Sequence, residues 1–127
     1  AWSGYAFEQV CLHHIRQIKE ALGISGVGTQ VSSWVGFEDG KKTGQIDLII
    51  DRRDETINLC EMKYSVKEYD ITPSYMKKLL NRIGDFQSST KTNKALHLTM
   101  VTVNGVKHNA QWNDIQNEVT AEQLFKE

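Results

Sequence analysis

The chain lacks several features that mark other classes of protein. No apolar run approaches the roughly 20 residues that a membrane-spanning helix needs, and no signal peptide is visible in the sequence. Its net charge is −1, so no overall positive charge draws it to nucleic acid. It has only two cysteines, Cys11 and Cys60. Both lie in apolar periodic segments, which predicts reduced core thiols in a cytoplasmic protein and no disulfide.

The composition that is present is that of a small globular domain. With 127 residues, of which 39% are apolar and 24% charged, the chain is long enough for one hydrophobic core. We therefore predict a single domain over residues 1–127. There are no internal repeats and no Walker A motif. Because the sequence begins Ala-Trp-Ser-Gly, without an initiator methionine, we expect it to be a fragment of a longer polypeptide.

Two apolar segments, residues 45–51 and 56–64, are joined by a short charged turn and carry the most informative pattern. Alternation with a period of two predicts a strand for each. In the first strand, one face is apolar and carries Ile46, Leu48 and Ile50. The other face carries Gln45, Asp47, Ile49 and Asp51. In the second strand, one face carries Ile57, Leu59, Glu61 and Lys63.

The acidic residues of the two strands are predicted to meet. If Asp51 pairs with Ile57, the register sets Asp47 opposite Glu61, with Cβ atoms roughly 4.5–5.5 Å apart. Two carboxylates at that distance repel each other unless a proton or a cation lies between them. Oxygen ligands without cysteine or histidine favour Mg²⁺ ahead of Ca²⁺ or Mn²⁺. With Lys63 about 6–7 Å from Glu61 at Cβ, the set suits attack of a metal-activated water on a phosphodiester.

The same residues resemble a known motif. Asp47, thirteen intervening residues and then Glu61-Met62-Lys63 are similar to the PD-(D/E)XK motif of type II restriction enzymes, archaeal Holliday-junction resolvases and Mrr-like nucleases. The proline that usually precedes the aspartate is replaced by Ile46. The resemblance extends over nearly the whole chain. The other segments that carry it are Gly4-Tyr5-Ala6-Phe7-Glu8, Trp34 and Leu124-Phe125, which resemble the C-terminal nuclease-like domain of certain prokaryotic AAA-type ATPases.

This resemblance implies a restriction-endonuclease-like core of order αβββαβ and a Mg²⁺-dependent DNA endonuclease. It implies that Asp47, Glu61 and the main-chain carbonyl of Met62 ligate Mg²⁺, with Mn²⁺ as a substitute. Glu8 is expected to complete the site, directly or through water. Lys63 is expected to orient or help deprotonate the attacking water and to offset charge in the transition state.

A first helix is predicted over residues 4–22. Its apolar stripe at steps of three and four consists of Phe7, Cys11, Ile15, Ile18 and Leu22. Glu8 borders this stripe, where a carboxylate needs a partner. The alternative is that Glu8 is a first-turn glutamate favoured by the helix dipole.

A second helix is predicted to start at Thr72-Pro73, with Thr72 as the N-cap. Its expected buried stripe is Met76, Leu79, Leu80, Ile83 and Phe86. Lys77, Lys78 and Arg82 fall elsewhere on this helix, as candidate phosphate contacts or as a solvated face. Gln45, which shares the predicted face of Asp47, is a candidate accessory contact of the metal shell.

The remaining segments complete an α/β pattern. Residues 29–37 and 95–103 are expected strands, residues 38–44 a polar turn, residues 88–94 a linker and residues 120–125 a short helix opened by a capping box. We predict a mixed central sheet flanked by helices, with three antiparallel strands and a fourth strand parallel to the third through the helical crossover.

Two other interpretations stay open. One is a catalytically silent nuclease-like module that regulates or binds an ATPase, since a fold does not fix a function. The other is an ordinary αβ domain in which Glu61 and Lys63 are a surface pair. The expected partners are DNA and an AAA-type ATPase domain of the same longer chain, and no membrane. The sequence leaves the oligomeric state open.

Overall fold

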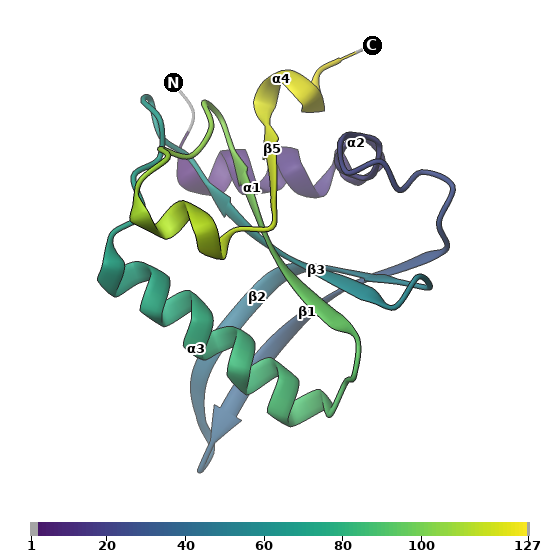
Figure 1. Cartoon of the computed structure of the whole chain (residues 1–127), viewed down its shortest axis with the longest axis vertical. Coiled ribbons are helices and arrows are strands. Elements are labelled where there is room, and N and C mark those ends of the chain that lie inside the picture. The colour runs from purple at the N-terminus through teal and green to yellow at the C-terminus, as the bar shows by residue number, and fades with distance from the viewer. Residues whose placement is uncertain (1–2, 127) are drawn as a thin grey trace.

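Five strands form one mixed sheet, and helices pack against both of its faces (Figure 1). The structure is a computed structural model that describes residues 3–126. This is the predicted α/β class. The elements in chain order are α1 (Gly4–Leu12), α2 (Ile15–Ala21), β1 (Thr29–Glu38), β2 (Lys41–Arg52), β3 (Thr56–Lys63), α3 (Pro73–Thr90), β4 (Ala95–Thr102), the 3₁₀ helix η1 (Ala110–Asp114), β5 (Asn117–Thr120) and α4 (Ala121–Leu124).

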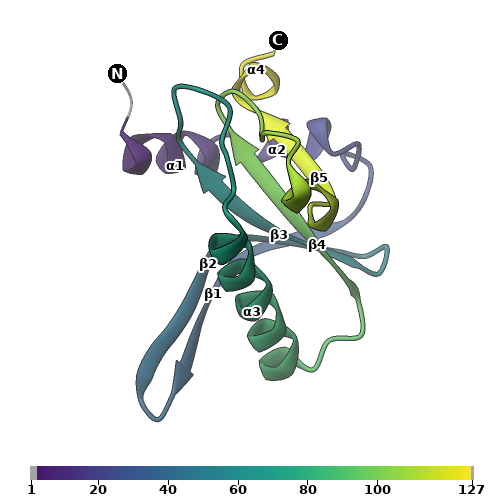
Figure 2. The ribbon, with the colours of Figure 1, turned by 60° about the vertical axis from the view of Figure 1, so that its left-hand side comes forward.

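The strand order follows the chain, β1-β2-β3-β4-β5. The β1–β2 and β2–β3 pairs are antiparallel, and β3–β4 and β4–β5 are parallel. The predicted directions of the first four strands are therefore confirmed, with α3 as the crossover between β3 and β4 (Figure 2). The sequence did not predict β5, because four residues are too few for alternation to be recognised.

The first predicted helix is broken in two, so a single helix over residues 4–22 is wrong. The ring Nδ1 of His14 lies 2.6 Å from the carbonyl oxygen of Val10, the acceptor that the His14 main-chain N–H would use in a continuous helix. That N–H instead bonds to Cys11, at 3.0 Å. The apolar stripe survives the break, because Phe7, Cys11 and Ile18 are all buried. Both short helices thus keep their apolar side toward the sheet.

The second predicted helix starts where its sequence indicates. The Thr72 hydroxyl accepts from the main-chain N–H of Tyr75 at 3.2 Å, and Pro73 occupies the first turn. The helix continues to Thr90, so the predicted linker begins too early. Leu80, predicted in the buried stripe, is 43% exposed. The face that packs on the sheet is narrower than predicted and consists of Met76, Leu79, Phe86 and the partly buried Ile83.

The hydrophobic core lies on both sides of the sheet. On one side, α1, α2 and α4 cover the alternate residues Leu48, Ile50, Cys60 and Met62. On the other side, α3 covers Ile49, Ile57 and Leu59. Cys11 and Cys60 are buried free thiols, as predicted. Burial raises the pKa of each to about 12, so neither is a reactive thiolate near neutral pH.

The hairpin of β1 and β2 is longer than predicted. Its turn is only Asp39 and Gly40, both with positive φ, and β2 starts at Lys41 within the predicted polar turn. The hairpin extends away from the other strands (Figure 2). Two register shifts interrupt the pairing, and both insert the extra residue on β2.

Candidate active site

The end of β3 directs an acid and a lysine toward α3. Because Leu59 packs under α3, Glu61 two residues later faces the same side. Its Oε2 accepts a hydrogen bond from the Tyr75 hydroxyl of α3. The Nζ of Lys63 lies 5.0 Å from the centre of the Tyr75 ring. The predicted common face of Glu61 and Lys63 is therefore present, and Tyr75 contacts both.

Asp47 lies at a bulge of β2. The predicted pairing of Asp51 with Ile57 is correct, but the β2–β3 ladder ends at Leu48 and Cys60. Asp47 and Glu61 are the next residues beyond this last pair. Their predicted direct pairing is therefore not part of the ladder. Bulges of this kind re-aim side chains and are common beside active sites.

The bulge also corrects the predicted faces of β2. Between Ser32 and Trp34 of β1, the β2 partner moves three positions, from Ile49 to Ile46. Ile46 therefore packs with Ile49 under α3, and not with Leu48 as strict alternation predicted. The extra residue therefore moves the side chain of Ile46, the residue before Asp47, to the opposite face of the sheet.

Glu8 reaches the same neighbourhood from α1. The helix begins after Ser3, whose hydroxyl accepts from the main-chain N–H of Ala6 at 3.1 Å. Partial burial raises the pKa of Glu8 above its usual 4.5, and the Asp47 carboxylate raises it further. The Lys63 ammonium lowers this pKa, and the Glu61 carboxylate raises it. Asp47, Glu61 and Lys63 thus all lie close enough to Glu8 for their charges to act on it.

The predicted accessory residue Gln45 contacts Asp47. Its amide group donates to Asp47 Oδ1, and its own carbonyl accepts from the Lys42 ammonium. Gln45 therefore positions one oxygen of Asp47, a role that the sequence did not assign. Lys42, expected in the polar turn, is therefore linked to Asp47 through Gln45 and adds a positive charge near this acid.

Glu61 has a second partner in Arg82, whose Nη1 lies 3.3 Å from Oε2. The sequence offered Arg82 as a phosphate contact, together with Lys77 and Lys78. Those two lysines are exposed on α3, whereas Arg82 is turned toward the sheet with its stem against Gly44. The structure therefore separates Arg82 from the two lysines.

The sequence missed Tyr75 and Tyr69. Burial raises the pKa of Tyr75 strongly, and the charge of Glu61 and its hydrogen bond to the hydroxyl raise it further, so this hydroxyl is protonated at neutral pH. Tyr69 packs edge-on against Tyr75, with ring centres 6.4 Å apart. Tyr75 and Arg82 are seven residues apart, which is about two helical turns. This spacing in the sequence could have indicated that both lie on the same face of α3.

The acids have the right chemistry for a hard cation. All three side chains offer oxygen, from three different elements. Burial raises the pKa of Glu8, and the carboxylates of Asp47 and Glu61 raise it further. Met62 is buried in the core beneath α1, so only its main-chain carbonyl is suited to join them. Within residues 3–126, no three His, Cys, Asp or Glu side chains stand close enough to form a ready ligand set.

The space beside Glu61 is small. The cavity between the sheet and α3 there measures about 20 Å³, room for a single water molecule. A metabolite does not fit into it. Glu8, Asp47 and Glu61 are each partly exposed.

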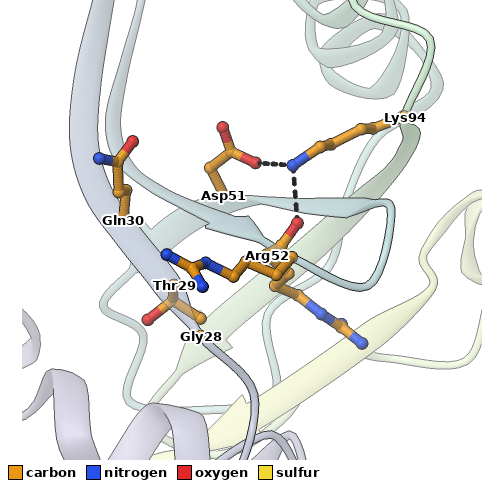
Figure 3. A pocket seen from close by; sticks show the side chains of 7 residues that line it. Gly28, Thr29, Gln30, Asp51, Arg52 and Lys94 are labelled. Atoms are coloured by element: carbon orange, nitrogen blue, oxygen red, sulfur yellow. Dashed lines mark hydrogen bonds and ion pairs between the residues drawn. The ribbon is translucent and has the colours of Figure 1, made fainter.

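A larger hollow lies at the far end of β2 and β3. It measures about 350 Å³ and is lined by Gly28, Thr29, Gln30, Asp51, Arg52, Arg53 and Lys94 (Figure 3). Lys94 Nζ lies 2.7 Å from Asp51 Oδ1 and from the Arg52 carbonyl oxygen. Arg52 is itself paired with Asp54, at 2.6 Å. These two cations are paired with the chain's own acids, whereas Arg53, the third cation of the lining, has no ion-pair partner within residues 3–126.

Comparison with known proteins adds no assignment. No family model, curated protein or solved structure matches the chain. The similarity to PD-(D/E)XK nucleases therefore rests on the motif residues and on the order of the elements. Among residues 3–126, no helix has the length and apolar character required to cross a membrane.

Proposed function

We propose that this chain is a Mg²⁺-dependent nuclease domain that hydrolyses phosphodiester bonds of DNA. One observation carries the proposal: acids from β2 and β3 and a neighbouring lysine all act on the charge of a carboxylate on α1. Glu8, Asp47, Glu61 and Lys63 are the residues concerned. The order of one helical segment, three antiparallel strands, a crossover helix and a parallel strand supports a restriction-endonuclease-like core.

In this proposal, Asp47, Glu61, Glu8 and the main-chain carbonyl of Met62 would hold the cation. Mg²⁺ bound there would supply an activated water and neutralise charge on the phosphate. Gln45 holds one oxygen of Asp47 in place through its amide. The roles of Asp47, Glu61, Glu8 and Met62 are those that the resemblance implies.

Lys63 supplies the positive charge for the reacting phosphate. Its ammonium lies over the face of Tyr75, and this contact limits the movement of the side chain. From there it can stabilise negative charge that develops on the phosphate oxygens. In the metal-free state, the Tyr75 hydroxyl and Arg82 hold the Glu61 carboxylate on the side of the sheet that faces α3.

The exposed lysines of α3 are the proposed contacts to the DNA backbone. Lys77 and Lys78 are both exposed on this helix, whose first turn carries Tyr75. Lysine contacts to phosphates position a nucleic acid without reading its sequence. The buried free thiols suit a cytoplasmic enzyme, and an AAA-type ATPase domain in the same longer chain is the proposed neighbour.

A second candidate is a nuclease-like interaction module without activity. It is favoured by the contacts of Glu61, whose Oε2 is already bonded to Tyr75 and Arg82. It is also favoured by the lack of a ready three-ligand set within residues 3–126. In that case the fold serves to bind the ATPase.

Cleavage of labelled DNA separates the two candidates. Duplex, single-stranded and branched substrates are incubated with the chain in Mg²⁺, Mn²⁺ or a chelator. We expect metal-dependent cleavage that is lost in Asp47→Asn and Lys63→Ala. Asp51→Asn is the matched control, because Asp51 lies on the same strand and pairs with Lys94 away from the acids. If wild type and Lys63→Ala are equally inactive on every substrate, the interaction module replaces the nuclease.

A further inference from the structure

The outer edge of β1 has the character of an interface. β1 is an edge strand of ten residues, and within residues 3–126 only β2 pairs with it. No charged residue and no proline occurs from Thr29 to Phe37. Monomeric proteins normally protect such edges with charges, proline, bulges or a covering segment. Here both bulges lie on β2, and most residues of β1 are exposed.

The strand also presents an apolar row. Val31, Val35 and Phe37 are 44%, 41% and 68% exposed. Their odd numbers place them on one face of the regular strand. An uncharged edge with an exposed apolar row is a template for another strand.

We propose that β1 pairs antiparallel with β1 of a second copy of this chain across a two-fold axis, which joins two sheets into one. We place Ser33 on the axis, opposite Ser33 of the second copy. Two residues are then opposite each other when their numbers add up to 66. Val31 then lies opposite Val35, and Phe37 opposite Thr29. Cross-strand neighbours on the same face contact each other, so Val31, Val35 and Phe37 each gain a contact across the interface.

Charge fixes this register. Ser33 on the axis puts Glu38 of one copy opposite Gly28 of the other. Gly28 lies next to Arg53, whose main-chain N–H bonds to the Gly28 carbonyl at 2.9 Å. The stem of Arg53 fills the space over Gly28, with Cδ 2.8 Å from where a Cβ atom would stand.

Neither charge has an ion-pair partner within residues 3–126. The two-fold axis therefore creates a Glu38–Arg53 pair at each end of the paired strands. A shift of two residues in either direction loses both pairs. An unrelated peptide strand would not carry charges at the spacing of Glu38 and Arg53. The proposed partner is therefore a second copy of this chain.

Sedimentation velocity over a concentration series tests the proposal. We expect wild type to be dimeric and Val35→Lys to raise the dissociation constant about tenfold or more, because two lysines enter the interface near the axis. Val66→Lys is the control, since Val66 is 78% exposed but lies outside β1. Wild type that stays monomeric at every concentration, or a dimer that Val35→Lys leaves unchanged, would overturn the proposal.

A charge exchange and a cross-link test the register. Arg53→Glu should weaken the dimer, and adding Glu38→Arg to it should restore the affinity. Ser33→Cys should give a covalent dimer under mild oxidation, because it faces itself across the axis. The natural thiols are buried and do not compete. A dimer that neither responds to the charge exchange nor cross-links at Ser33 contradicts this pairing of strands.

Discussion

Replacing Tyr75 by phenylalanine isolates the contact that holds Glu61. The change removes the hydroxyl that donates to Glu61 Oε2 and leaves the ring, its packing and its contact with Lys63 in place. The Glu61 side chain is only 17% exposed, so solvent replaces the lost donor poorly. A hydrogen bond to a charged group contributes about 1.5–3 kcal/mol. Because Arg82 remains 3.3 Å from the same oxygen, we expect the lower end, about 1.5 kcal/mol.

For a chain of this length, that loss lowers the melting temperature by about 6 °C. Differential scanning calorimetry at pH 7 in a chelator measures it. Tyr5→Phe is the matched control, because Tyr5 is 73% exposed and its hydroxyl has no hydrogen bond within residues 3–126. A double-mutant cycle with Glu61→Ala, which removes the acceptor, then gives the coupling between the two side chains. If Tyr75→Phe has the same melting temperature as wild type, or if the coupling free energy between Tyr75 and Glu61 is zero, the arrangement of Glu61 described above is refuted.

Three further changes test other parts of the structure. Because the pKa of Glu8 is raised above 4.5, its charge destabilises the metal-free fold increasingly as pH rises from 4.5. Glu8→Gln should therefore be more stable than wild type to urea at pH 7 and equal to it at pH 3; a less stable variant at pH 7 contradicts this. Phe7→Ala should lose about 3–5 kcal/mol of unfolding free energy in urea, since Phe7 is fully buried; a loss below about 1 kcal/mol contradicts the packing. Thr72→Ala should lose about 1 kcal/mol through the N-cap of α3, and an unchanged urea midpoint would show that the cap is not stabilising.

Local chemistry made part of the fold predictable. The alternation of Ile57, Leu59 and Glu61 placed β3 and its faces correctly, because the period of a strand is set by the backbone alone. Thr72 and Pro73 placed the start of α3, because an N-cap acts over three residues. The order and direction of the first four strands followed from these elements and short connections.

Features that depend on tertiary contacts were not predictable. At the break, the His14 ring contacts the Val10 carbonyl oxygen and the His14 main-chain N–H bonds to Cys11, an exchange that periodicity does not reveal. The bulge before Asp47 reversed the face of Ile46, and nothing in residues 45–51 marks the extra residue. The contact of Tyr75 with Glu61 joins residues from different elements, which periodicity does not reveal.

The central claim is that acids on three elements form one divalent-cation site, and metal-linked stability tests it most directly. Calorimetric melting of wild type, Asp47→Asn and Asp51→Asn is followed as Mg²⁺ is added. Ligand at one hundred times its dissociation constant stabilises a fold by about 2.7 kcal/mol, or about 10 °C here. We predict that rise for wild type and Asp51→Asn, and none for Asp47→Asn. No rise in wild type, or an equal rise in Asp47→Asn, would contradict a cation site at Asp47, Glu61 and Glu8.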